Sequence, residues 1–178
     1  MPNITSSTTL EELAATISQA LVGKGIIATL SGGAAVQIYT DNEYLSKDLD
    51  FVTSSAHREL SRVLEPLGFK RIANSRLYEH PASEWLLEFP SGPLSFGDQI
   101  VDQETIDAFE SEYGPLRIIP PTLSLLDRLA AYSYHNDPQC FDQAKSLAKL
   151  KSIDWTHVEQ WLISERLPMA LLDELRQE

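Results

Sequence analysis

Residues 30–39 read LSGGAAVQIY, and residues 46–52 read SKDLDFV. The second stretch alternates acidic and apolar residues, which is the pattern of a half-buried β-strand. Side chains at positions i and i+2 of a strand share one face, so Asp48 and Asp50 are expected to point the same way while Leu49 points into the core. The sequence therefore predicts two carboxylates in one small site.

Two neighbouring carboxylates are unfavourable without a cation. Each ionised group raises the pKa of the other unless a positive charge neutralises them. Mg²⁺ is bound through one or two carboxylates and takes its other ligands from water and from substrate phosphates. The Asp48–Asp50 pair therefore predicts a divalent metal site and phosphate chemistry.

The first stretch supports the same chemistry. Gly32 and Gly33 lie between an expected strand and an expected helix, where a backbone without side chains allows a ligand to approach closely. The start of a helix offers free N–H groups and the positive end of the helix dipole to a phosphate. Ser31 adds a hydroxyl donor. A Ser-Gly-Gly turn or an Asp-x-Asp strand end alone is usually structural, but the two in this order, with a helix between them, indicate a phosphate site.

The rest of the chain divides into two parts. Thr9 and Glu12 have the spacing of a capping box ahead of the first helix. Helices are expected at 10–22, 34–39, 55–67, 123–134, 139–150, 155–163 and 168–175, and strands at 26–30, 48–53, 69–73, 76–79, 85–89 and 116–119. The fold class is therefore expected to be α+β, with a small mixed β-sheet and flanking helices in residues 1–119 and a helical bundle packed on that core in residues 120–178.

Composition excludes several classes of protein. The chain has 178 residues, 43% of them hydrophobic, which is sufficient for one compact globular unit and excludes a mainly disordered chain. The formal net charge of -12 argues against indiscriminate nucleic-acid binding. The chain contains no run near the roughly 18 apolar residues of a membrane span, and its N-terminus lacks a secretory signal pattern. With a single cysteine, Cys140, the sequence predicts a cytoplasmic protein without membrane contacts.

The two motifs resemble those of the nucleotidyltransferase superfamily that includes DNA polymerase β, and within it the minimal prokaryotic enzymes of abortive-infection and toxin–antitoxin systems. Gly32-Gly33 corresponds to the glycine motif at a helix start, and Asp48-Leu49-Asp50 to the acidic pair on the next strand. The resemblance implies that the glycine motif binds a nucleoside triphosphate. It also implies that the acidic residues bind two Mg²⁺ ions, or Mn²⁺, together with a third acidic residue on a later strand.

Glu88 is the best candidate for the third carboxylate, because an acidic residue among the apolar neighbours of 85–89 needs a reason to be there. Glu84 and Asp98 are the alternatives, and a plain edge-strand glutamate is nearly as common. If the resemblance holds, Glu88 completes both the catalytic and the metal-binding set with Asp48 and Asp50.

Two basic residues are further candidates for nucleotide binding. Lys47 adjoins the acidic pair and could reach a phosphate, although strand geometry turns its side chain away from Asp48 and Asp50. Residues 126–132 resemble the helical tail of the abortive-infection enzymes, where charged residues face the nucleotide cleft, and this resemblance selects Arg128. The family pattern often has a lysine near position 127, where this chain has Asp127.

The function expected from these features is transfer of a nucleoside monophosphate from a nucleoside triphosphate to a hydroxyl acceptor by a two-metal mechanism. The acceptor is left open among protein, RNA and small molecules, and a cognate toxin or antitoxin is a possible partner. Two alternatives remain. One is a non-catalytic nucleotidyltransferase-fold partner or antitoxin-like binding module, and the other is a metal-dependent phosphohydrolase.

Overall fold

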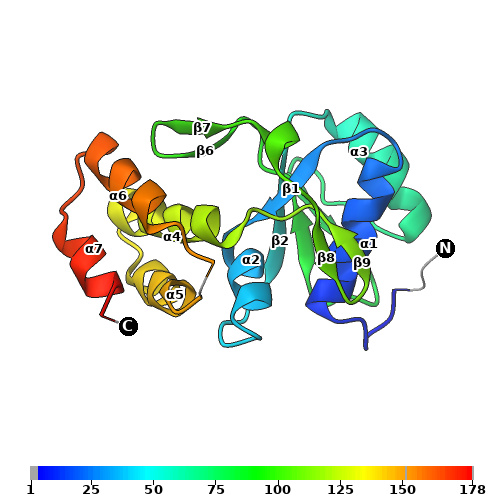
Figure 1. Cartoon of the computed structure of the whole chain (residues 1–178). Helices are drawn as coiled ribbons and strands as arrows, with labels where there is room; N and C mark the ends of the chain where they lie inside the picture. Colours follow the sequence, from blue (N-terminus) through cyan, green and yellow to red (C-terminus); the bar gives the residue numbers. More distant parts are fainter. Residues whose placement is uncertain (1–3, 151, 178) are drawn as a thin grey trace.

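A computed structural model of the chain describes residues 4–150 and 152–177 (Figure 1). The helices are α1 (Leu10–Val22), α2 (Gly32–Tyr39), α3 (His57–Leu64), α4 (Pro121–His135), α5 (Pro138–Ala148), α6 (Trp155–Ser164) and α7 (Ala170–Leu175), with 3₁₀ turns at Glu65–Leu67 and Gln103–Thr105. The strands are β1 (Ala28–Ser31), β2 (Asp48–Thr53), β3 (Lys70–Arg71), β4 (Leu77–Glu79), β5 (Leu86–Glu88), β6 (Leu94–Phe96), β7 (Gln99–Val101), β8 (Phe109–Ser111) and β9 (Gly114–Leu116).

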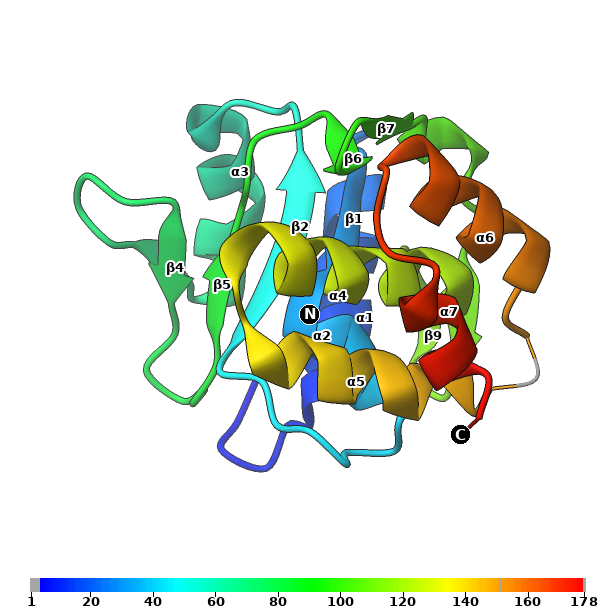
Figure 2. The same ribbon diagram turned by 90° about the vertical axis from the view of Figure 1, so that its left-hand side faces the viewer.

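Five strands form a mixed sheet in the order β1-β2-β5-β4-β3. β2 pairs antiparallel with β1 and parallel with β5, and Figure 2 shows it between these two strands. The register places Asp50 opposite Ser31 on one side and opposite Glu88 on the other. Since paired residues on adjacent strands lie about 5 Å apart, this register decides which side chains can meet.

The first helix forms as its sequence predicts. The Thr9 hydroxyl accepts a hydrogen bond from the Glu12 N–H at 3.2 Å, which satisfies one of the free donors of the first turn of α1. Leu13, Ile17 and Leu21 recur at helical spacing and are fully buried. α1 packs beside α3 against the sheet (Figure 1).

The C-terminal helices share one hydrophobic core with the sheet. A single cluster of buried side chains extends from Leu13 in α1 through Leu49 in β2 to Leu126 in α4 and Trp161 in α6. α2 lies between the sheet and these helices, in contact with α4 and α5 (Figure 1). The structure thus confirms the α+β class and the mixed sheet, while the division of the chain near residue 120 stays a prediction.

Several element boundaries differ from those expected. The helix predicted at 55–67 is an α-helix only to Leu64, because Pro66 has no N–H to continue it, and a 3₁₀ turn completes the range. The strand predicted at 116–119 is displaced. β9 ends at Leu116, and the Ile119 N–H donates to the carbonyl of Leu30 at 3.0 Å along the edge of β1.

Two hairpins were not predicted at all. β6 pairs with β7, and β8 pairs with β9, each through strands of three residues. Within the described residues, no helix is both long enough and apolar enough to cross a membrane.

The phase of β2 can be tested by comparing two leucines. Leu49 is fully buried between Asp48 and Asp50, whereas Leu45 is 79% exposed. We expect Leu49→Ala to lower the free energy of unfolding by about 2–5 kcal/mol, as for other buried leucines. Leu45→Ala should change it by less than about 0.5 kcal/mol. Urea denaturation measures both, and equal losses would contradict the strand phase.

Candidate active site

Three carboxylates from adjacent strands meet at one place. Asp48 and Asp50 come from β2, and Glu88 comes from β5, where it is paired with Asp50. One carboxylate oxygen of each residue lies within 4.8 Å of the others, and all three residues are partly buried. Among the described residues these three form a group with the spacing of a metal site. The structure therefore brings together the three acidic residues that the sequence selected.

The crowding is visible in the pKa of Asp50. Burial raises this pKa to about 7, assisted by the negative charges of Asp48, Glu88 and Asp127, while the positive charge of Arg128 opposes the shift. Because the pKa is raised, the ionised form of Asp50 at neutral pH lowers the free energy of unfolding of the protein. A bound divalent cation would remove this cost, so the donor set fits a metal that prefers oxygen ligands.

Gly32 is required by this carboxylate cluster. Its backbone is left-handed, with φ +68°, and a Cβ at this position would lie 2.4 Å from Oδ2 of Asp50. A Cβ at Gly33 would lie 3.0 Å from the Ser46 hydroxyl. The two glycines therefore let the start of α2 lie close to the Asp50 carboxylate and the Ser46 hydroxyl.

The structure shows the surroundings of the two other nucleotide-binding candidates, Ser31 and Lys47. The buried Ser31 hydroxyl donates to the backbone carbonyl of Asp50 at 3.4 Å and forms no side-chain cap on α2. Lys47 is exposed, and its backbone carbonyl accepts a hydrogen bond from Leu86 where β2 meets β5. Their assignment to nucleotide binding stays a prediction.

Arg128 is held beside the start of α2 by its neighbour Asp127. Oδ2 of Asp127 accepts the Gly32 N–H at 3.1 Å and also Nη2 of Arg128 at 2.7 Å. Nη1 of Arg128 donates to Oε1 of Gln143 at 3.2 Å. Burial alone would lower the pKa of Arg128, but the charge and hydrogen bond of Asp127, together with Cys140 and Asp50, raise it above its ordinary value. Sequence reasoning selected Arg128 but not Asp127, whose only signal was an acidic residue where the family often has lysine.

The structure separates Glu88 from the two alternatives. Glu88 forms an ion pair with Arg76 at 3.2 Å, beside the acidic pair. Glu84 is exposed in the loop before β5. Asp98 lies in the turn between β6 and β7, where its N–H donates to Glu165. Of these three acidic residues, Glu88 is therefore the one that lies beside Asp48 and Asp50.

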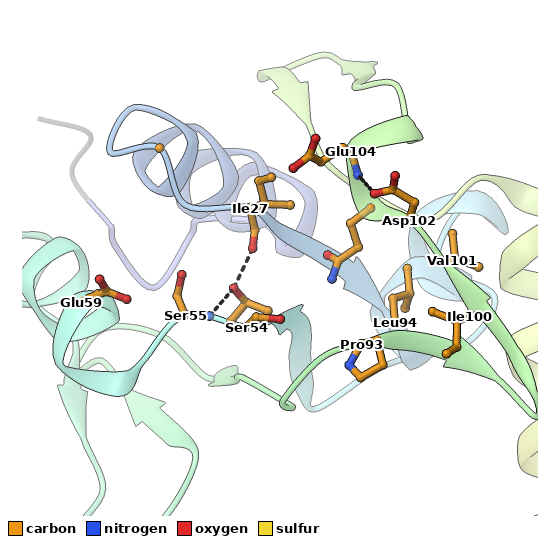
Figure 3. Close-up of a pocket in the computed structure, with 13 residues that line it drawn as sticks. Ile27, Ser54, Ser55, Glu59, Pro93, Leu94, Ile100, Val101, Asp102 and Glu104 are labelled. Carbon is orange, nitrogen blue, oxygen red and sulfur yellow. Dashed lines mark hydrogen bonds between the residues drawn. The ribbon is translucent and has the colours of Figure 1, made fainter.

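One cavity of the structure lies away from the three carboxylates. It has a volume of about 570 Å³ and begins where β2 ends, at Thr53 and Ser54 (Figure 3). Figure 3 shows Ile27 and Ser55 beside it, and the Thr53 hydroxyl joins both, donating to the Ile27 carbonyl and accepting the Ser55 N–H. None of the three clustered carboxylates lines it. The chemistry of the carboxylates, rather than the volume of a cavity, therefore locates the candidate site.

In sequence, the chain matches no protein-family model and no curated protein. In structure it is similar to a nucleotidyltransferase-like protein from Paracoccidioides brasiliensis, with a TM-score of 0.59 and 16% identity over 95% of this chain and 94% of that one. It is also similar to the lincosamide antibiotic adenylyltransferase LnuA with lincomycin bound, with a TM-score of 0.54 and 17% identity over 80% of this chain and 98% of that one.

A third similar structure is ANT(2")-Ia in complex with adenylyl-2"-tobramycin, with a TM-score of 0.52 and 16% identity over 95% of this chain and 98% of that one. The chain therefore has the polymerase β-like nucleotidyltransferase fold, which the resemblance of its two motifs predicted.

Neutralising Asp50 should stabilise the metal-free protein. Because the pKa of Asp50 is raised from 3.8 in the unfolded chain to about 7 in the fold, Asp50 destabilises the fold by an amount that grows as the pH rises from about 4 and is complete above about pH 7. At pH 8 in chelator, Asp50→Asn should raise the free energy of unfolding by at least about 1.4 kcal/mol, the equivalent of one pKa unit. At pH 5 the advantage of Asp50→Asn should be smaller but not absent, because the folded carboxyl group must still take up a proton that the unfolded chain has released.

The control for Asp50→Asn is Asp142→Asn, which removes a negative charge from an exposed position. Urea denaturation at both pH values measures all three proteins. A loss of stability in Asp50→Asn at pH 8 would show that the three carboxylates do not repel one another in the folded chain.

Comparing alanine substitutions at two left-handed glycines distinguishes the cost of backbone strain from the cost of the contact with Asp50. Gly25 has φ +71° with open space around a Cβ, whereas Gly32 has φ +68° and the close approach to Asp50. Gly25→Ala should cost about 1 kcal/mol from its backbone conformation alone. Gly32→Ala should cost at least about 1 kcal/mol more, because the carboxylate must move. Chemical denaturation measures the free energy of unfolding of both variants, and equal losses would show that Gly32 is not in close contact with the acidic cluster.

Proposed function

We propose that this chain, which has the nucleotidyltransferase fold, transfers a nucleoside monophosphate from a nucleoside triphosphate to a hydroxyl acceptor and releases pyrophosphate. The observation that carries the proposal is the convergence of Asp48, Asp50 and Glu88 beside the N-terminal end of α2. Carboxylates for cations and helix N–H groups for anions are the two requirements of metal-assisted phosphate chemistry.

The acidic cluster suits Mg²⁺ or Mn²⁺. Its three carboxylates supply the oxygen ligands that these cations prefer, and the raised pKa of Asp50 indicates that the cluster lacks positive charge. We propose that Asp48 and Asp50 bind two such ions and that Glu88 completes one of the two sites. Bound there, the cations would neutralise charge on the phosphates and on the attacking and leaving oxygens.

The phosphates are proposed to bind at the start of α2. The N–H groups of Gly32 and Gly33 belong to its first turn, which has no partners within the helix for its donors. Arg128 is largely buried beside Gly32 and provides a fixed positive charge. Ser31 and Lys47 are secondary candidates, because the Ser31 hydroxyl already has an acceptor and Lys47 is exposed.

Glu88 is proposed to accept the proton of the acceptor hydroxyl. The hydroxyl oxygen forms a bond to the α-phosphorus while the bond from that phosphorus to the bridging oxygen breaks, and pyrophosphate leaves with that oxygen. The ion pair with Arg76 holds the Glu88 carboxylate beside Asp50, and a carboxylate within reach of the hydroxyl can act as a general base.

The names of two similar structures suggest which substrates to test first. One is an adenylyltransferase with lincomycin bound, and the other contains adenylyl-2"-tobramycin. We therefore place ATP first among the triphosphates and a small molecule with several hydroxyl groups first among the acceptors. Protein and RNA acceptors, and a toxin or antitoxin partner, stay predictions from the sequence.

The decisive experiment is a transfer assay with each α-labelled triphosphate, Mg²⁺ and a panel of acceptors that includes an aminoglycoside, a lincosamide, RNA and protein. Glu88→Gln should lower turnover by at least about 100-fold, the usual effect of removing a general base. Triphosphate affinity should change only a few-fold, because Asp48 and Asp50 remain.

The matched control is Glu84→Gln, which makes the same change at an exposed position in the same segment and should keep full activity. Full activity in Glu88→Gln would exclude Glu88 as the base. Release of inorganic phosphate without labelled acceptor would instead support the phosphohydrolase. Triphosphate binding without turnover would support the non-catalytic module.

A further inference from the structure

One oxygen of Asp127 takes the contacts that a phosphate oxygen would need. Oδ2 accepts the Gly32 N–H from α2 at 3.1 Å and Nη2 of Arg128 from α4 at 2.7 Å. Both donors are assigned above to the triphosphate. An anionic oxygen that binds one helix N–H and one guanidinium has the chemistry of a bound phosphate.

The contact differs from an ordinary helix cap. An ordinary N-cap is the residue directly before the helix, but Ser31 forms no side-chain cap on α2, and the acceptor comes from Asp127, 95 positions from Gly32. Arg128 is held in place at the same time by Gln143 and by Sγ of Cys140, at 3.2 and 3.6 Å. Arg128 therefore keeps contacts to α5 that do not depend on the Asp127 carboxylate.

Asp127 also lies near other negatively charged side chains. Its charge adds to those of Asp48 and Glu88 in opposing the ionisation of Asp50. An incoming triphosphate carries further negative charge, and it cannot share the single Gly32 N–H with the carboxylate. Like charges at this distance repel, so the ligand and the Asp127 carboxylate exclude each other.

We propose that the Asp127 carboxylate occupies the phosphate position at Gly32 in the unliganded chain, and that a polyphosphate binds by displacing it and taking over both Gly32 and Arg128. The inference rests on the proposed function for the identity of the ligand as a triphosphate. The displacement weakens every anion equally, so an anion with few other contacts does not bind.

The experiment measures binding of Mg²⁺-tripolyphosphate, which carries the shared phosphate chemistry without a base, by calorimetry. Asp127→Ala should bind it about tenfold more tightly than the wild type, since a charge-assisted hydrogen bond no longer has to be broken. Asp127→Asn should show a smaller gain, because its amide oxygen can still accept the Gly32 N–H. Inorganic phosphate should bind measurably only to Asp127→Ala.

The control for net charge is Asp142→Ala, on the neighbouring helix α5 and exposed. It should change the affinity by less than about twofold, because solvent and salt screen an exposed charge. An equal gain in Asp142→Ala and Asp127→Ala would overturn the inference, since it would show a general charge effect. A residue that only caps α2 would weaken binding when removed, so a gain in affinity separates the two roles.

The inference and the proposed function fail in different ways. Affinity for tripolyphosphate in Asp127→Ala that equals or falls below that of the wild type overturns the inference, whatever the transfer assay shows. If Asp127→Ala does not fold, Asp127→Asn decides by the same measurement. Absence of nucleotide transfer with a clear gain in tripolyphosphate affinity overturns the proposed function and leaves the anion position at Gly32 standing.

Discussion

Three carboxylates share a space less than 5 Å across, and their mutual repulsion governs the structure around them. Gly32 has no side chain because Oδ2 of Asp50 fills the space that a Cβ would need. Glu88 pairs with Arg76, and the buried Arg128 opposes the rise in the Asp50 pKa. Cations of the protein surround the cluster but do not neutralise it, which is the arrangement expected of a site that completes its charge with a bound metal.

The hydrophobic core determines the position of the strand that carries the two aspartates. Leu49 and Phe51 alternate with Asp48 and Asp50 along β2 and are fully buried, so the core fixes the strand against the tendency of the carboxylates to separate. The backbone of the packed strand therefore keeps the two aspartates on one face, two positions apart. The core thus stabilises a charge arrangement that would not persist on an isolated strand.

The C-terminal helical region belongs to the same site through α4. Its residues Leu125, Leu126 and Leu129 are fully buried in the common core, which fixes the rotation of the helix. That rotation directs Asp127 and Arg128 to the first turn of α2. A helix packed in this way brings a carboxylate and a guanidinium to the start of α2 from outside the sheet.

The sequence alone determined the features that depend on local periodicity. The alternation in β2, the Thr9 cap of α1 and the glycines at the start of α2 follow from residues a few positions apart, where strand and helix geometry are fixed by the backbone. Tertiary structure alone decided which distant residues join them. Glu88 reaches Asp50 through parallel pairing of β2 with β5, and Asp127 reaches Gly32 across the chain, because register and helix rotation are set by how the whole core packs and leave no period in the sequence.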